Sequence, residues 1–150
     1  MEYYQHILVS VDDSPIAVAA ADQAMVLAKA FGSKVTIVSV VIIDPLTSVS
    51  FYKNVPGVTD YFLEAQAHAK NILAELGARF SEAGIPAETK LLAKQSPSEA
   101  IAELADELKA DLIVVGSHGR TGLKKTFIGS IAQDILTASH VPVLVVKHTQ

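Results

Sequence analysis

The sequence predicts an α/β fold with one open five-stranded parallel sheet and helices on both faces. Three observations support this. Short β-branched runs alternate with longer segments of helical period along the whole chain, and Gly and Pro punctuate the junctions between them. Most strand candidates are apolar at nearly every position, as in strands covered on both faces. At 150 residues the chain fits a single domain, which we assign to residues 1–150.

The chain opens with a strand and a helix. Residues 6–11 form a short apolar run, which predicts a buried strand. Ser14 and Pro15 follow as an N-cap and a first-turn proline, and together they favour the start of a helix. The helix is expected to run towards Phe31 and to end at Gly32, since glycine readily adopts the backbone conformation that terminates helices.

A second strand leads into the longest helix. Residues 34–41 are strand-like, and residues 42–58, with two prolines and a glycine, are expected to form a long connection with a mobile flap. From about residue 59 to residue 83, apolar side chains recur at helical spacing and predict one stripe packed against the sheet. The stripe comprises Tyr61, Ala65, Ala69, Ile72, Leu76 and Phe80. Gly84 is expected to end this helix.

The second half of the chain repeats the alternation. Residues 87–93 are a less hydrophobic strand, expected towards an edge of the sheet. Ser96 and Glu99 fit a capping box, with Pro97 at the first helical position. The residues of this helix expected to face the core are Ile101, Leu104, Ala105 and Leu108. Residues 111–115 form the fourth strand.

A short helix over residues 130–139 and a strand over residues 141–146 complete the pattern. Because right-handed crossovers join parallel strands, the simplest sheet order is 3-2-1-4-5. Strands 1 and 4 are then neighbours wound in opposite directions, and their carboxyl ends open a crevice of the kind that binds ligands in α/β sheets. The loops at this crevice are residues 12–14 and 116–129.

The loop after the fourth strand carries the clearest functional signal. Gly116, Gly119 and Gly129 punctuate it before Ser130 and Ile131 open a helix. Gly119 and Gly129 can adopt a positive φ and let an anion approach the backbone, while the N–H groups and the dipole of the helix attract negative charge. The pattern is that of a phosphate-binding loop, and the alternative is a turn without a ligand. It matches neither the Walker loop nor the dinucleotide fingerprint.

Other polar residues of the same loop leave alternatives open. Arg120, Lys124 and Lys125 could clamp phosphates or could be solvated loop charges. Ser117 and His118, with an aspartate, supply the residue types of a nucleophilic triad, but their spacing does not match a nucleophile elbow. Adjacent Ser and His side chains are not expected to align, so no catalytic residue is assigned.

Asp12 is the candidate metal-linked residue. Mg²⁺ takes one or two carboxylates together with phosphate oxygens and water, so Asp12 could serve a phosphate-bound magnesium ion. The alternative is an Asx cap on the first helix. The histidines without ligand spacing, which predict no zinc site and are expected at the surface or at strand ends, are His6, His68, His140 and His148.

Composition excludes several classes of function. Twelve basic against sixteen acidic side chains, with no basic tract, argue against nucleic acid as a partner. No apolar run reaches the roughly 20 residues of a membrane helix, and the first residues lack the basic start of a signal peptide, so neither membrane insertion nor secretion is expected. The absence of cysteine excludes disulfides and thiolate metal sites, which fits a cytoplasmic location.

These motifs resemble the ATP-binding branch of the universal stress protein family. The pattern Gly-x2-Gly-x9-Gly-Ser/Thr of that branch is met, without insertion or deletion, by Gly116, Gly119, Gly129 and Ser130. Residues 11–14, 38–40 and 142–147 are also similar to the family, and the resemblance covers about residues 6–147. It implies a Rossmann-like fold of the adenine nucleotide alpha hydrolase type and a site for ATP with Mg²⁺.

The resemblance also implies roles for individual residues. The backbone of Val40 would meet adenine, Asp12 would lie near the ribose and a phosphate-bound metal, and Gly116 would lie by the ribose. The implied phosphate ligands are Gly119, Gly129, Ser130 and Ile131, with Arg120 as a further nucleotide-binding candidate. Asp13 stands where family members vary, so no role is assigned to it.

We therefore expect a cytoplasmic ATP-binding stress-response or regulatory protein. Nucleotide occupancy would order residues 42–58 and the glycine loop, and would change a surface that an unidentified regulatory protein recognises. A slow ATPase or adenylate-forming enzyme is one alternative, and an interaction module with an empty crevice is another. The apolar final strand, residues 141–147, is expected at the sheet edge, where unpaired backbone groups favour a homodimer; family members commonly dimerise through it.

Overall fold

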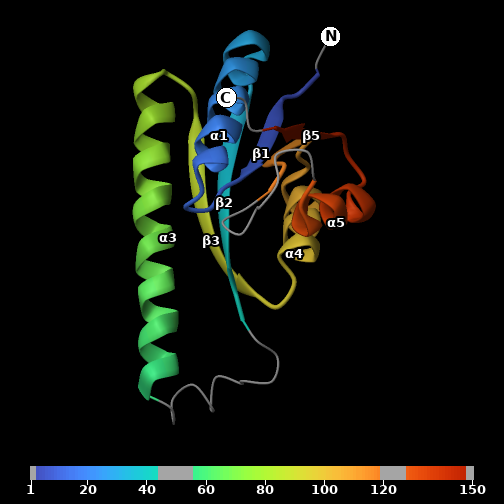
Figure 1. Ribbon diagram of the computed structural model, residues 1–150. Coiled ribbons are helices and arrows are strands. Elements are labelled where there is room, and N and C mark those ends of the chain that lie inside the picture. The colour runs from blue at the N-terminus through green and yellow to red at the C-terminus, as the bar shows by residue number, and fades with distance from the viewer. Residues whose placement is uncertain (1–2, 44–55, 119–127, 148–150) are drawn as a thin grey trace.

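The computed structural model describes residues 3–43, 56–118 and 128–147 (Figure 1). The elements are β1 (His6–Ser10), α1 (Pro15–Phe31), β2 (Lys34–Ile42), α3 (Pro56–Glu82), β3 (Ala87–Lys94), α4 (Pro97–Leu108), β4 (Leu112–Gly116), α5 (Ser130–Ala138) and β5 (Val143–Val146). The predicted alternation is confirmed, with boundaries within two residues except at the start of α3. That helix begins at Pro56 instead of near residue 59, so Pro56 and Gly57 belong to its first turn and not to the preceding connection.

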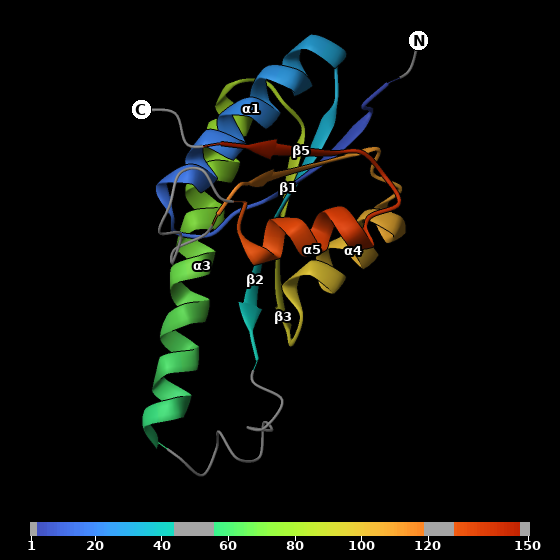
Figure 2. The same cartoon turned by 45° about the vertical axis from the view of Figure 1, so that its right-hand side comes forward.

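The five strands form one parallel sheet in the order β3-β2-β1-β4-β5, which confirms the predicted order and the edge position of β3. Helices α1 and α3 cover one face, and α4 and α5 cover the other (Figures 1 and 2). The change of face occurs between the central neighbours β1 and β4. The helix that follows β1 and the helix that follows β4 therefore leave the sheet in opposite directions.

Side chains of β1 alternate between two hydrophobic cores. Ile7 and Val9 point into the core under α1 and α3, whereas Leu8 points into the core under α4 and α5. All three are fully buried, which explains why the strand is continuously apolar. On α1 the buried stripe is made largely of alanines, such as Ala20 and Ala24, whose small side chains let the helix lie close to the sheet.

Helix α3 is longer than the sheet that it covers. Its 27 residues span roughly 40 Å, whereas β2 and β3, the strands on which it packs, have nine and eight residues and span about 30 Å and about 26 Å. Leu76 and Phe80 are buried against the sheet, but Tyr61 is 72% exposed, and the early part of the helix projects beyond the end of β2 (Figures 1 and 2). The predicted stripe is thus wrong for Tyr61 and Ala65, which do not pack on the sheet.

His6 joins three elements at the amino end of the sheet. Its Nδ1 lies 3.2 Å from the Leu108 carbonyl oxygen and its Nε2 lies 2.7 Å from Thr36 Oγ1. Since a carbonyl can only accept, Nδ1–H donates and Nε2 accepts from the threonine. The Asp111 carboxylate accepts the backbone N–H groups of Gln5 and His6. His6 is a strand-end residue as predicted, but it is buried and not at the surface.

Burial lowers the pKa of His6 below its ordinary value of 6.5. The unfolded chain therefore binds a proton at a pH where the folded chain does not, and the contribution of His6 to stability is present above pH 6.5 and lost as the pH falls below it.

We expect wild-type protein to lose more stability than a His6→Asn variant between pH 7.5 and pH 5.5. The excess should not exceed about 1.4 kcal/mol per pH unit, the limit for one proton. Urea unfolding at the two pH values measures it. Equal pH dependence in the two proteins would show that His6 does not take part in this linkage.

Candidate functional site

A cavity of about 740 Å³ opens at the carboxyl ends of β1 and β4, as the reversal of winding predicts. Six of the eight predicted ligand residues line it: Asp12, Val40, Gly116, Gly129, Ser130 and Ile131. The other two, Gly119 and Arg120, lie outside the described residues, as do Lys124 and Lys125. The tertiary structure therefore gathers the acidic loop, the end of β2 and the start of α5 around one space.

The backbone of β2 reaches the cavity because this strand is longer than its neighbour. β1 ends at Ser10, which pairs with Val38, so the last four residues of β2 extend past it. The Val38 carbonyl accepts the N–H of Val11 at 2.9 Å and so points towards β1. Backbone groups two residues apart point the same way, so the N–H and C=O of Val40 face the space beyond β1. They form a donor and acceptor pair suited to the edge of a planar base.

Asp12 organises the turn between β1 and α1. Its Oδ1 accepts the backbone N–H of Ser14 at 2.9 Å and also the Ser14 hydroxyl, which is an Asx turn at the start of the helix. Ser14 is the N-cap residue as predicted, but its side chain makes no capping hydrogen bond because it binds Asp12 instead. The carboxylate thus supports the turn and lines the cavity at the same time.

The amino end of α5 presents backbone donors to the cavity. Gly129 is its N-cap and has no side chain to bind the first N–H groups, and the first turn holds no acidic residue. Ser130 and Ile131, the first two helical residues, both line the cavity. By contrast, the Ser96 hydroxyl caps α4 by accepting the N–H of Glu99. At α5 the N-cap residue makes no such side-chain hydrogen bond, so its first N–H groups are available to an anion as far as the described residues show.

Close packing explains the glycines at the two ends of the loop. An added Cβ at Gly129 would lie 3.2 Å from the Ser117 carbonyl oxygen and from His118 Cα, and one at Gly116 would lie 2.9 Å from Ile16 Cγ2 of α1. Gly129 has a φ of −66° and so does not adopt the positive φ that its being glycine would allow. Its N–H donates to the Ser117 carbonyl at 2.5 Å and brings α5 against the end of β4.

The geometry excludes a hydrolytic role for Ser117. Its hydroxyl lies 3.1 Å from His118 Nδ1, so the expectation that these adjacent side chains do not align is wrong. The reason is that β4 ends at Gly116, and both residues lie in the turn that follows it. However, Ser117 is only 1% exposed and does not line the cavity, whereas His118 does. A buried hydroxyl cannot reach a substrate as a nucleophile.

One wall of the cavity was not predicted from the sequence. Helix α3 contributes Tyr61, Ala65 and His68 from the part before the sheet, and Ala69 and Ile72 from where it begins to pack on the sheet. Their spacing puts them on one helical face, which is the stripe expected to pack on the sheet. Helix length is the signal that could have revealed this wall, because a helix of 27 residues is longer than the strands of eight and nine residues on which it packs.

Within the described residues, no group of three or more His, Cys, Asp or Glu side chains is placed to hold a metal ion. Asp12 and its neighbour Asp13 are the carboxylates that line the cavity among the described residues. This donor set fits magnesium that is bound to the phosphates of a ligand and does not fit a metal held by protein groups only. None of the helices in the described ranges is long and apolar enough to cross a membrane.

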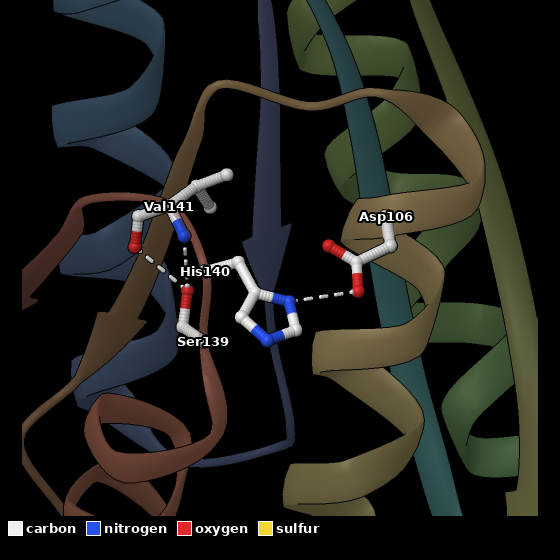
Figure 3. Close-up of polar contacts among 4 residues, drawn as sticks. All are labelled: Asp106, Ser139, His140 and Val141. Atoms are coloured by element: carbon white, nitrogen blue, oxygen red, sulfur yellow. Dashed lines mark hydrogen bonds and ion pairs between the residues drawn. The ribbon is translucent and has the colours of Figure 1, made fainter.

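A second group of Ser, His and Asp residues lies at the opposite end of the sheet (Figure 3). His140 Nδ1 lies 3.1 Å from Asp106 Oδ2, while the Ser139 hydroxyl donates to the Val141 carbonyl and accepts the Val141 N–H. The serine is thus bonded to the backbone and not to the imidazole. These contacts join the turn before β5 to α4, and they are not a catalytic triad.

Comparison with known proteins agrees with this geometry. A model described as the universal stress protein family matches residues 3–147. A universal stress protein of Methanocaldococcus jannaschii is 32% identical over 144 residues, covering 96% of this chain and 82% of that protein. A universal stress protein of Archaeoglobus fulgidus solved with dAMP has a TM-score of 0.68 at 26% identity, covering 98% of this chain and 100% of that one. A universal stress protein solved with cAMP has a TM-score of 0.68 at 28% identity, covering 98% and 99%.

We expect Gly129→Ala to lower the free energy of unfolding by about 1–3 kcal/mol, because the new methyl group meets backbone atoms that cannot move aside. Chemical denaturation measures the change. Gly77→Ala is the matched control: its Cβ would meet only a methyl group of Thr89, at 3.2 Å, and alanine favours the helix there. Equal stability of Gly129→Ala and wild type would contradict the packing argument.

Proposed function

This chain belongs to the universal stress protein family, and on that premise we propose that it binds ATP with Mg²⁺ in the crevice between β1 and β4 and acts as a regulatory protein. The adenine would lie against the backbone of Val40, the ribose near Asp12 and Gly116, and the phosphates at the start of α5. Gly119 and Arg120, outside the described residues, remain proposed nucleotide ligands.

The observation that carries this proposal is the contrast between the two helix starts beside the cavity. At α1 the positive end of the helix dipole already has a carboxylate beside it, because Asp12 accepts the N–H of Ser14. At α5 the N-cap is glycine and no acid follows in the first turn. An anionic phosphate is therefore favoured at α5, where Ser130 adds a hydroxyl donor, and is disfavoured beside Asp12 unless a cation accompanies it.

The dimensions and the relatives support an adenine nucleotide. A cavity of about 740 Å³ lies within the range of small-molecule sites, and it combines apolar walls with a few polar groups. The relatives solved with dAMP and with cAMP hold ligands that share an adenine base and a phosphate. We propose ATP over a monophosphate because the glycine pattern continues into a helix start with several donors.

We propose a signalling role and not efficient turnover. Ser117, which pairs with His118, is buried and cannot act as a nucleophile. His118 is the remaining candidate in the described residues to position water. A slow ATPase is the alternative. The proposed output is a nucleotide-dependent surface read by a regulatory protein in the cytoplasm.

We also propose a homodimer through the edge strand β5 and the residues that flank it, 141–147. β5 lies at the edge of the sheet beside β4, and Leu144 is 36% exposed. An apolar edge strand offers unpaired backbone groups to a second copy, and Pro142 limits pairing only at its start.

For the nucleotide site, we expect ATP to bind the purified protein, and both Asp12→Ala and Ser130→Ala to weaken binding by about tenfold, since each removes one polar contact to the ligand or its metal. Isothermal titration with Mg·ATP measures this. Thr137→Ala, which removes a hydroxyl from the same helix outside the cavity, is the control for Ser130→Ala.

Absence of ATP binding by wild-type protein, and of any nucleotide after acid extraction, would contradict the proposed function. Release of ADP or AMP well above background, abolished by Asp12→Ala, would establish the enzymatic alternative instead.

For the dimer, we expect Leu144→Lys to shift the protein from dimer to monomer at micromolar concentration, because a charge at the paired edge is costly to bury. Sedimentation velocity measures the change, with Val26→Lys, an equally drastic change at an exposed position of α1, as the control. A monomeric wild type would rule this assembly out.

A further inference from the structure

A polar pair joins α3 to the loop after β1 inside the cavity. His68 Nε2 lies 3.2 Å from Asp13 Oδ2, and both residues line the cavity. The Asp13 side chain is 20% exposed and that of His68 is 61% exposed, so the carboxylate is partly shielded from water while the imidazole stays accessible to a ligand. Two lone pairs at this separation would repel, so Nε2 carries the proton, and Nδ1 is the acceptor of the neutral imidazole.

His68 lies where α3 begins to pack on the sheet, next to the buried Ala69. Burial against the sheet begins at Ala69 and continues through Leu73 and Leu76, while Tyr61 is exposed to the cavity side. A helical face exposed only to water is usually polar, yet this face keeps apolar residues and one imidazole. The inner face of the overhang is therefore shaped for a ligand that is flat and apolar with a few hydrogen-bond donors.

Charge separates the two ends of the cavity. Asp12 and Asp13 place carboxylates at the β1 end, whereas the start of α5 offers N–H groups and the positive end of a dipole. An anion next to Asp13 would be repelled, so the group beside His68 is the uncharged part of the ligand. In a nucleotide this part is the nucleoside, whose hydroxyl and amino groups donate hydrogen bonds.

We propose that the Asp13–His68 pair positions the nucleoside half of the nucleotide. The proposal rests on the proposed function. His68 accepts a hydrogen bond from a ribose hydroxyl or from the exocyclic amine of the base, and Asp13 holds the imidazole in the tautomer that can accept it. The pair also holds the overhang of α3 against the ligand, so α3 becomes a specificity wall of the site.

The test compares ligands that share or lack a nucleoside. We would titrate ATP, AMP, adenosine and inorganic tripolyphosphate into wild type and His68→Ala. Binding of the three nucleoside ligands should weaken about fivefold to tenfold, the size of one hydrogen bond, and tripolyphosphate should bind as before. His140→Ala is the matched control, because it removes a histidine paired with Asp106 at 3.1 Å at the far end of the sheet, and it should change no affinity.

Three further variants separate positioning from a structural role. Asp13→Ala should weaken binding of the same three ligands. In the double variant Asp13→Ala/His68→Ala, the fold-loss of affinity should be smaller than the product of the two single fold-losses, because both residues act as one pair. His68→Gln, which keeps an N–H donor and an acceptor, should recover part of the affinity. Thermal unfolding of each variant reports any loss of stability separately.

Unchanged nucleoside binding by His68→Ala would overturn this inference and leave the proposed function intact. Equal weakening of tripolyphosphate would overturn it as well, since His68 would then lie at the phosphate end. A loss of affinity that only follows a loss of thermal stability would assign the pair a structural role. Failure of wild type to bind any adenosine compound would overturn both proposals.

Discussion

Opposite winding after β1 and β4 is the constraint on which this structure depends. These strands are neighbours at the centre of the sheet, but α1 leaves towards one face and α5 is reached on the other. Neither helix can cover the carboxyl ends of both strands, so the space between them stays open. The cavity is therefore a consequence of topology, and the side chains that line it decide only what it holds.

The amino ends of α1 and α5 give the cavity two different sides, one with a carboxylate and one with backbone N–H donors. Asp12 meets the amino end of α1, while α5 begins at a glycine whose N–H is bound to the Ser117 carbonyl and whose Cβ position is filled by neighbouring backbone. The same glycine thus holds α5 against β4 and leaves the helix start open. Packing therefore requires glycine here, because a larger side chain would meet the neighbouring backbone.

The overhang of α3 changes how the site is understood. From the sequence, the stripe that includes Tyr61 and Ala65 is indistinguishable from the part that packs on the sheet, because periodicity reports a face and not what covers it. The structure shows that α3 packs on β2 and β3 and that its first turns extend past the end of β2 (Figures 1 and 2). The first half of that stripe, together with His68, becomes a wall of the cavity. The same limit applies to Ser117, whose burial no local pattern reveals.

Sequence alone determined the order of elements, the parallel sheet, the switch point and six of the residues that line the cavity. These follow from local periodicity, from glycine and proline at the junctions, and from the handedness of crossovers. Tertiary structure decided what depends on distances between remote segments. It placed His6 between Leu108 and Thr36, brought His68 to Asp13, and made close contact the reason for Gly129. Such contacts arise only when strands and helices of unequal length are packed together, and no spacing along the chain encodes them.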